Sequence, residues 1–242
     1  MKISLLISIL LCLVLTQADP LPNYIKPCKI TDEQCIIENG NLAWQKLIFG
    51  DKDFQIPVLT PVFELNEVKV DLNPNFFLHH TNIKMNSAKS YTIRGAKYKS
   101  DENKLAFTLF NPLNDVDSLY EIKLIDFLGK DINGKGTFKL DIINANYTFD
   151  VYLKTITKES VDYLNVDKTT FDFLPEKISF KFANLFDGDV TKGEDANLHI
   201  ENHWREFYEE VRTSYSAVMA NLVKGIFDSF LNKIPKTELF LN

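Results

Sequence analysis

The sequence has few cysteines and few histidines. Its 242 residues include three cysteines and four histidines, and none of them forms the closely spaced cluster of a four-ligand zinc site. It also lacks a C-x-x-C redox pair and the Gly-x-Ser-x-Gly turn that presents a hydrolase serine. The adjacent His79 and His80 should point to opposite faces of a strand, one at the surface and one at an edge. We therefore expect no metal centre and no cofactor, and an esterase or lipase is a weak hypothesis.

An excess of positive charge is missing as well. The chain has 27 Lys and Arg residues against 33 Asp and Glu residues, which gives a formal net charge of −6. A phosphate backbone or an anionic lipid surface would be repelled by this net field, so no nucleic-acid partner is expected. Beyond the first residues, no apolar run is long enough to cross a bilayer, so we expect no stable membrane insertion and a monomer.

The first 18 residues are typical of a secretory signal peptide. Lys2 supplies the positive start, residues 3–15 form a short apolar run, and small residues precede a cleavage point after Ala18. The alternative is an N-terminal anchor helix. We expect cleavage, with residues 1–18 removed and residues 19–242 forming a single secreted, extracellular domain. Cleavage changes the formal net charge to −7, because Lys2 is lost.

Two cysteines, Cys28 and Cys35, remain once Cys12 is lost with the leader. In a secreted chain such a pair favours a disulfide. Residues seven apart in a helix lie about 10.5 Å apart along its axis, whereas disulfide Cα atoms lie roughly 4.4–6.8 Å apart. One helix therefore cannot contain both. A Thr-x-x-Gln capping box predicts Thr31 as the N-cap of a helix over residues 32–49, with the disulfide joining the incoming loop to its first turns.

From Phe54 to about residue 200, apolar and polar residues mostly alternate, which is typical of strands with one buried face. No strand–helix–strand pattern interrupts them, so we expect an antiparallel sheet. Asn133-Gly134 lies between two alternating runs and predicts a hairpin turn. The Asn-Tyr-Thr sequon makes Asn146, at the start of a predicted strand, a candidate glycosylation site.

The spacing then becomes helical. Asn202 is expected to cap a helix over residues 203–234 that Pro235 stops. The second half of this helix has apolar residues on several faces, as an enclosed helix does. His199 and His203 have the spacing of two metal ligands, but the expected cap separates them. We predict an α+β fold in which a strongly curved antiparallel sheet wraps around a long C-terminal helix, with a short N-terminal helix.

Four segments resemble one family of insect proteins. LPNYIKPCKITDEQC resembles a Leu-Pro…Cys…Cys opening, LIFGDKDFQIPVLTPVFELNEVKV resembles a Gly…Ile-Pro-x-Leu-x-Pro-Val segment, and ENHWREFYEEV and FLNKIPKTELF match a helix and tail. Together they make the whole mature chain similar to the takeout and haemolymph juvenile-hormone-binding protein family. Thr60 stands where the family often has Asp, which implies a local change in turn capping. The single cysteine pair favours the takeout branch, because juvenile-hormone-binding members proper tend to have a second disulfide.

The resemblance implies a TULIP-like super-roll that encloses a tunnel. It also implies a non-enzymatic carrier of a small elongated lipophilic ligand, fatty-acyl or terpenoid and juvenile-hormone-like, in haemolymph or another extracellular fluid. A binder of bacterial lipid or membrane surface is the alternative, and a secreted lipid-modifying enzyme is a third hypothesis. Each candidate lining residue could instead be packed core that touches no ligand. The candidates are Phe107, Phe149, Val151, Phe180, Tyr215, Val218 and Leu222.

Overall fold

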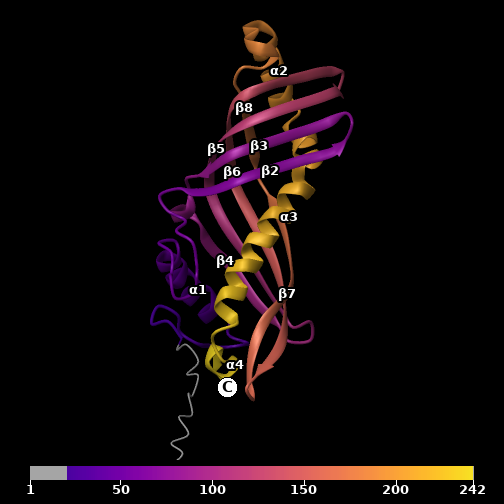
Figure 1. Ribbon diagram of the computed structural model, residues 1–242. Coiled ribbons are helices and arrows are strands. Elements are labelled where there is room, and N and C mark those ends of the chain that lie inside the picture. The colour runs from indigo at the N-terminus through magenta and orange to yellow at the C-terminus, as the bar shows by residue number, and fades with distance from the viewer. Residues whose placement is uncertain (1–20, 242) are drawn as a thin grey trace, which may run out of the picture.

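The computed structural model describes residues 21–241, so the expected signal peptide, with Cys12, lies outside the described residues. A curved sheet runs the length of the molecule and one long helix lies along its inner side (Figure 1). The helices are α1 (Glu33–Leu47), α2 (Val190–Asn202), α3 (Trp204–Leu231) and α4 (Lys236–Leu239), with 3₁₀ turns η1 (Ala88–Ser90) and η2 (Phe186–Gly188). The strands are β1 (Cys28–Lys29), β2 (Phe63–Asn73), β3 (Phe76–Met85), β4 (Thr92–Lys99), β5 (Lys104–Phe127), β6 (Lys130–Lys158), β7 (Val161–Leu174), β8 (Lys177–Phe182) and β9 (Phe240–Leu241).

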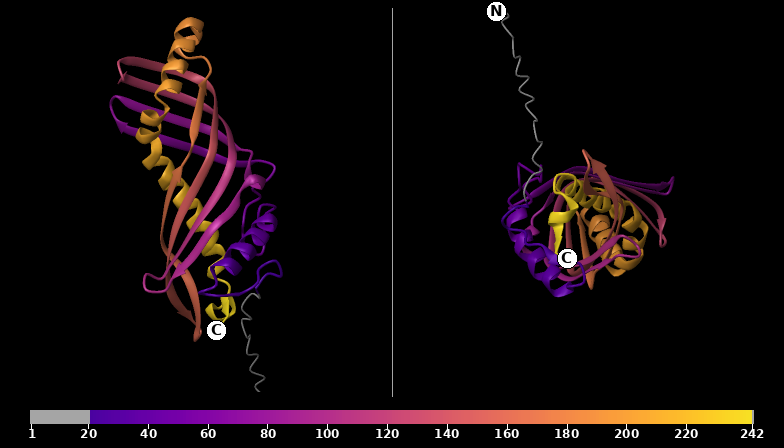
Figure 2. Two further views of the ribbon diagram at one scale, coloured as in Figure 1. Left: turned by 180° about the vertical axis from the view of Figure 1, so that it is seen from behind. Right: turned by 90° about the horizontal axis from the view of Figure 1, so that it is seen from below.

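The long strands β5 and β6 organise the sheet. β5 pairs with β4 along its first half and with β3 along its second half, while β6 pairs with β8 and then with β7. These pairings, and that of β2 with β3, are all antiparallel. Strand twist accumulates along such long ribbons and curls the sheet, and the view from below shows it curving around α3 (Figure 2). The predicted α+β class, with a curved antiparallel sheet around a long C-terminal helix, is confirmed.

The hairpin predicted at Asn133-Gly134 is wrong. Both residues lie inside β6, and the chain turns earlier, at Gly129, which has a φ of +87°. Pairing of β6 with β5 from Lys130 to Tyr152 overrides the local turn preference of Asn-Gly. Glycine has a different use on this strand, since a Cβ placed on Gly136 would lie 2.4 Å from the carbonyl oxygen of Ala183. Glycine therefore lets the segment after β8 lie directly on β6.

The helix predicted over residues 203–234 is also different in the structure. α2 occupies a stretch that was expected to be strand, and it ends at Asn202, so Asn202 is not the N-cap of α3. The two helices are separated by His203, which has φ −116° and ψ 34°. Asp189 caps α2 by accepting a hydrogen bond from the backbone N–H of Lys192. The strand-like alternation expected for this stretch is wrong. The buried residues of α2, Ala196 and Ile200, are four apart, which is the spacing of one face of a helix.

The N-terminal helix is close to its predicted place. Its N-cap is Asp32 and not Thr31: the Asp32 carboxylate accepts a hydrogen bond of 3.0 Å from the N–H of Cys35. The predicted disulfide is present, with the Cα atoms of Cys28 and Cys35 5.9 Å apart. It joins β1 to the first turn of α1, and β1 pairs in parallel with β9. The first and last described elements therefore meet at one end of the roll (Figure 1).

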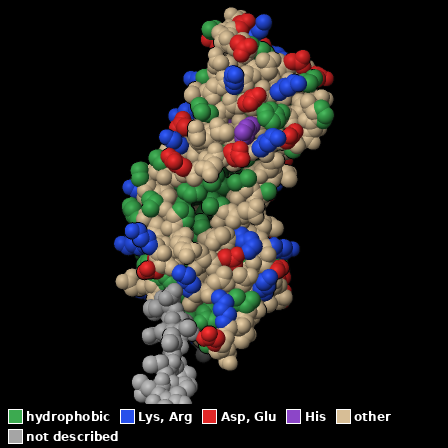
Figure 3. All heavy atoms as spheres, in the orientation of Figure 1, with side chains coloured by type: hydrophobic (Ala, Val, Ile, Leu, Met, Phe, Trp, Pro, Cys, Tyr) green, Lys and Arg blue, Asp and Glu red, His purple; other side chains and the backbone are tan. Residues whose placement is uncertain are grey.

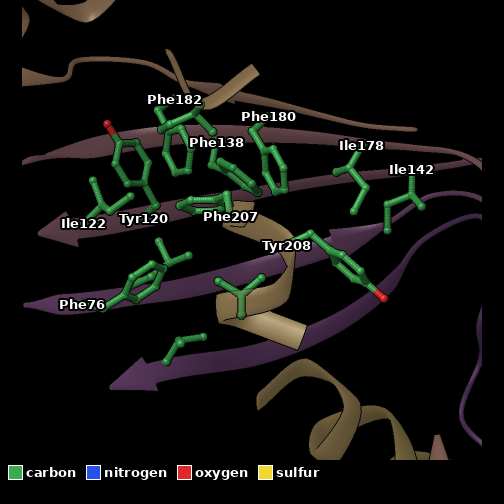
Figure 4. Packing of buried hydrophobic residues seen from close by; sticks show 14 of the residues in the cluster. Phe76, Tyr120, Ile122, Phe138, Ile142, Ile178, Phe180, Phe182, Phe207 and Tyr208 are labelled. Carbon is green, nitrogen blue, oxygen red and sulfur yellow. The ribbon is translucent and has the colours of Figure 1, made fainter. Parts of the chain in front are cut away.

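Aromatic side chains (Figure 4) fill the opposite end of the roll, where they cluster with Ala196 and Ile200 of α2. Phe207 of α3 inserts between strands, with its ring centroid 4.8 Å from that of Phe180 and 5.8 Å from that of Phe76. Phe138 and Phe182, 4.7 Å apart, continue the cluster across β6 and β8. Edge-to-face and tilted contacts of this kind add to the free energy gained by burying the rings. These contacts hold the N-terminal end of α3 against the sheet.

Candidate functional site

A large internal space lies at the other end of the roll, between the second half of α3 and the sheet. It is a cavity of about 390 Å³, and α1 closes one side of it through Ala43, Trp44 and Leu47. Such a volume is in the range of about 300–1,000 Å³ that small-molecule sites occupy. α3 contributes apolar side chains from several faces, Leu222 and Phe227 among them, which explains why this half of the helix is not simply amphipathic.

A smaller cavity of about 100 Å³ continues toward α2. The two cavities share five lining residues, which we call the constriction: Met85, Tyr91, Asn114, Tyr147 and Met219. Methionine side chains are unbranched and flexible, so two of the five can change shape at low cost. The two cavities are therefore neighbours along the roll, separated by side chains of which two are flexible.

The constriction also holds polar atoms. The hydroxyl group of Tyr147 is buried and makes no hydrogen bond of acceptable geometry, although the side chains of Tyr91 and Asn114 lie beside it. Burial raises the pKa of Tyr147 to about 12 and also raises that of Tyr91 well above its ordinary value. Both phenols are therefore neutral. A buried hydroxyl without a partner costs about 1–3 kcal/mol, so Tyr147 can gain from meeting a ligand oxygen or a water molecule.

His80 is a polar residue in the wall of the smaller cavity. Its side chain is 2% exposed, so its predicted place at the surface or a strand edge is wrong: it points into the roll from β3. Its Nδ1 atom lies 2.9 Å from the Ser118 hydroxyl oxygen, whereas its Nε2 atom has no hydrogen-bond partner. Burial, with a smaller contribution from His79, lowers the pKa of His80 to about 3. The ring is therefore uncharged at neutral pH.

Charge is nearly absent from this interior. Among the described residues that line the two cavities, only Lys26 belongs to the Asp, Glu, Lys and Arg types. Lys26 is exposed and precedes β1, so its ammonium group belongs to the rim of the larger cavity. Figure 3 shows a hollow with hydrophobic side chains about halfway along one face of the molecule. The arrangement suits an uncharged, elongated molecule and lacks a group of catalytic residues.

The comparison with known families decides the identity of the fold. The haemolymph juvenile hormone binding protein model matches residues 6–241. The chain belongs to this family. The family that the sequence segments predicted is thus confirmed. No curated protein matches the chain.

Solved structures agree with the family assignment. The crystal structure of Epiphyas postvittana Takeout 1 superposes with a TM-score of 0.79 at 22% identity, covering 90% of this chain and 100% of that one. This likeness shows the fold. The crystal structure of a lipopolysaccharide binding protein gives a TM-score of 0.39 at 13% identity, covering 84% of this chain and 40% of that one. That score is too low to carry an argument.

Within this family member, the seven predicted lining residues do not all lie in the same place. Phe107, Phe149 and Leu222 line the larger cavity, and Phe180, Tyr215 and Val218 line the smaller one. Val151 lines neither cavity. It is fully buried in a hydrophobic cluster with Leu153, Leu164, Val166 and Leu231, of which all but Val166 line the larger cavity. Contact of the other six with a ligand stays a prediction.

Sequence reasoning did not predict the polar side chains that line the interior, His80 and Tyr147. His80 was one of a pair of adjacent histidines, and Tyr147 was noticed only as the middle of the sequon. Tyr147 has the same strand parity as Phe149, which was predicted to face inward, so alternation alone could have found it. Asn146 has the opposite parity and is half-buried on the outer side of β6, in mid-strand and not in a turn. Its glycosylation stays a prediction.

Other functional features are absent from the described part of the chain. In residues 21–241, no group of three or more His, Cys, Asp and Glu side chains could hold a metal ion. His199 Nε2 lies 3.1 Å from the carbonyl oxygen of Phe127, so this histidine has a structural partner. No helix within the same residues combines the length and the apolar character needed to cross a membrane.

Proposed function

We propose that the protein is a secreted, non-enzymatic carrier that holds one small elongated lipophilic molecule in the two neighbouring cavities. The observation that carries this proposal is an interior space of two apolar cavities that share one constriction. Membership of a family described as juvenile hormone binding supports it. A fatty-acyl or terpenoid, juvenile-hormone-like chain has the elongated shape that such a space requires.

The energetics favour moderate affinity. Each buried CH₂ group contributes about 0.8 kcal/mol, so a chain with about ten such groups gains roughly 8 kcal/mol before costs. Loss of motion of the ligand and ordering of side chains subtract from this gain. We therefore expect a dissociation constant in the micromolar range, and tighter binding only where the ligand also makes a hydrogen bond in the interior.

Secretion is part of the proposal. Removal of residues 1–18 would leave residues 19–242 as a single extracellular domain, and the Cys28–Cys35 disulfide suits an oxidising compartment. We also propose that the carrier is a monomer in haemolymph or another extracellular fluid. Mass spectrometry of the protein from its own tissue tests the cleavage point, and a mature chain that still contains Lys2 would contradict it.

A glycan on Asn146 is proposed separately. The side chain lies on the outer side of β6, away from both cavities, so a sugar there would increase solubility without changing ligand affinity. Treatment of the secreted protein with a peptide N-glycosidase tests this. The proposal predicts a fall in mass and unchanged binding, and an unchanged mass would contradict it.

Native mass spectrometry tests the carrier function itself. The mature protein is extracted with organic solvent, refolded, checked for its cooperative unfolding transition, and mixed with a long-chain fatty alcohol or a terpenoid ester. We expect a 1:1 complex that saturates at micromolar ligand. The refolded protein without ligand, and a globular protein with no cavity, provide the baseline for non-specific adducts. A folded protein that forms no complex above this baseline with either probe would end the carrier proposal.

A further inference from the structure

The smaller cavity has a feature that an apolar tail does not need. His80 is enclosed there by apolar side chains, and its ring lies 4.5 Å from the ring of Phe138 and 6.1 Å from that of Tyr215, measured between centroids. The hydrogen bond between Nδ1 and Ser118 fixes the orientation of the ring. Nε2 is then the remaining polar atom of the side chain, and it is buried without a partner. A ring held in this way is already positioned for a polar group that enters the cavity.

We propose that the oxygen-bearing end of the ligand enters the smaller cavity and that a ligand hydroxyl group hydrogen-bonds to Nε2 of His80. This inference rests on the proposed carrier function and adds to it an orientation and a ligand class. The apolar chain of the ligand then lies through the constriction and in the larger cavity. Lipophilic alcohols are the class that this arrangement selects.

The chemistry of the imidazole ring favours a hydroxyl group. A neutral imidazole has one N–H donor and one acceptor, and the bond to Ser118 is compatible with either tautomer. A hydroxyl group can donate or accept, so it can pair with Nε2 in both cases. An ester or ether oxygen can only accept, and it would require the proton to be on Nε2.

An ionised carboxylate suits the smaller cavity poorly. Among the described residues that line this cavity, none is Lys or Arg, and desolvation of an unpaired carboxylate is costly. The ammonium group of Lys26 lies at the rim of the larger cavity, on the α1 side. A fatty acid would therefore place its carboxylate at that rim, which reverses its orientation relative to an alcohol of the same length.

A competition experiment tests the inference. A fluorescent lipid is displaced from the delipidated protein by a long-chain primary alcohol and by the alkane with the same number of carbon atoms. The comparison is made with the wild-type protein, His80→Leu, His80→Gln and Tyr147→Phe. We expect the wild-type protein to bind the alcohol about 3- to 10-fold more tightly than the alkane, the effect of one net hydrogen bond. His80→Leu should lose this preference while it still binds the alkane.

The other two variants separate a hydrogen bond from packing and locate the oxygen. His80→Gln retains a donor and an acceptor and should keep part of the preference, and Tyr147→Phe should keep more of it than His80→Leu. Loss of the preference in Tyr147→Phe and not in His80→Leu would place the oxygen at the constriction and overturn the inference. Equal binding of alcohol and alkane by the wild-type protein would also overturn it, since a water molecule would then satisfy Nε2.

Nitrogen-15 NMR of histidine side chains gives a readout that does not depend on affinity. The sequence contains four histidines, and one of them, His80, lines a cavity in the described residues. Saturation with the alcohol should shift the Nε2 signal of His80, and saturation with the alkane should shift it much less. If the alkane binds and the alcohol leaves this signal unchanged, only this inference fails. If neither ligand binds to folded protein, the carrier proposal itself fails.

Discussion

At the scale of single residues, His80 links the interior to the pH dependence of stability. Its pKa is about 3 in the folded protein because burial disfavours the charged ring, against an ordinary value of 6.5. The unfolded chain therefore binds a proton below pH 6.5 that the native protein does not bind until about pH 3. Stability is lost as the pH falls through this window, and it is retained above it.

Replacing His80 with Leu should remove this loss. From the two pKa values, the wild-type protein should lose about 1.4 kcal/mol of unfolding free energy through His80 between about pH 7.5 and 5.5. His80→Leu should lose less by about that amount, while carboxylates contribute equally in both proteins. Urea unfolding at the two pH values measures the difference. Replacement of His203, whose side chain is 40% exposed, is the control, and equal pH dependence in the wild-type protein and His80→Leu would contradict the account.

The disulfide permits a second prediction at this scale. Changing both Cys28 and Cys35 to Ser should lower the unfolding free energy by about 2.5 kcal/mol, the loop-entropy cost for eight residues. The protein should still fold, because the aromatic cluster of the sheet lies at the other end of the roll. Thermal and urea unfolding measure the change. If the double variant has the same unfolding midpoint as the wild-type protein, the chain-entropy argument does not apply here.

Neighbouring inward-facing residues show where sequence reasoning stops at this scale. Phe149 and Val151 have the same parity on β6, and both were predicted to face the interior, which they do. Phe149 lines the larger cavity, whereas Val151 is covered by neighbours that themselves line it, because the space beside each residue depends on side chains from β7 and α3. Alternation fixes the face of a strand, but not what fills the space opposite it.

At the scale of elements, Asn197 is the residue of α2 that bonds to the backbone of β8. The amide of Asn197 accepts a hydrogen bond from the N–H of Phe182 at 2.9 Å and donates one to its carbonyl oxygen at 2.8 Å. The amide therefore pairs with both backbone groups of Phe182, the last residue of β8, as the backbone of a neighbouring strand would. A helix that satisfies both backbone groups of a buried strand residue should be needed for stability.

Asn197→Ala should therefore destabilise the protein by about 2 kcal/mol, since it leaves two backbone groups of Phe182 unpaired. Ligand affinity should not change, because Asn197 lines neither cavity. Urea unfolding and probe binding are measured together, with the exposed Glu194→Ala on the same helix as the control. A loss of stability no greater than that of the control would mean that the two hydrogen bonds are not important.

The second half of α3 allows a test of occupancy. Leu222 is half-buried and faces the larger cavity, so a tryptophan there can extend into empty space. Leu222→Trp should weaken binding of a fluorescent fatty acid about 10-fold or more, while the unfolding free energy changes by less than about 1.5 kcal/mol. Leu198→Trp, at a position that is 59% exposed on α2, is the matched control. Equal affinity in the two variants would show that the ligand does not occupy this cavity.

Element boundaries were less predictable than the type of most elements. The capping box placed the first helix correctly to within one residue at its start, yet Asp32 and not Thr31 provides the cap. The last long helix was expected from Asn202 onward, but a break at His203 ends one helix and begins another. Caps of neighbouring polar residues are nearly equivalent in energy, so tertiary packing selects between them.

At the scale of the whole molecule, two sequence features were sufficient to predict the architecture. Long alternating segments without βαβ units require an antiparallel sheet, and a helix with apolar residues on several faces requires enclosure. The cavities could not be predicted in the same way, because apolar residues that fill a core and apolar residues that line a space have the same pattern. Their existence depends on the distance between α3 and the sheet, which many contacts determine together.

Methionine methyl NMR tests most directly whether a lipophilic ligand occupies the interior. The chain contains three methionines, and a protein that begins at residue 19 retains Met85 and Met219, both at the constriction. The delipidated protein, labelled with carbon-13 in these methyl groups, is titrated with a lipid that has a nitroxide label on its chain. The account predicts that both methyl signals broaden together and that the effect saturates at one lipid per protein. Signals that remain sharp while the probe is bound would place the lipid outside the roll and contradict the account.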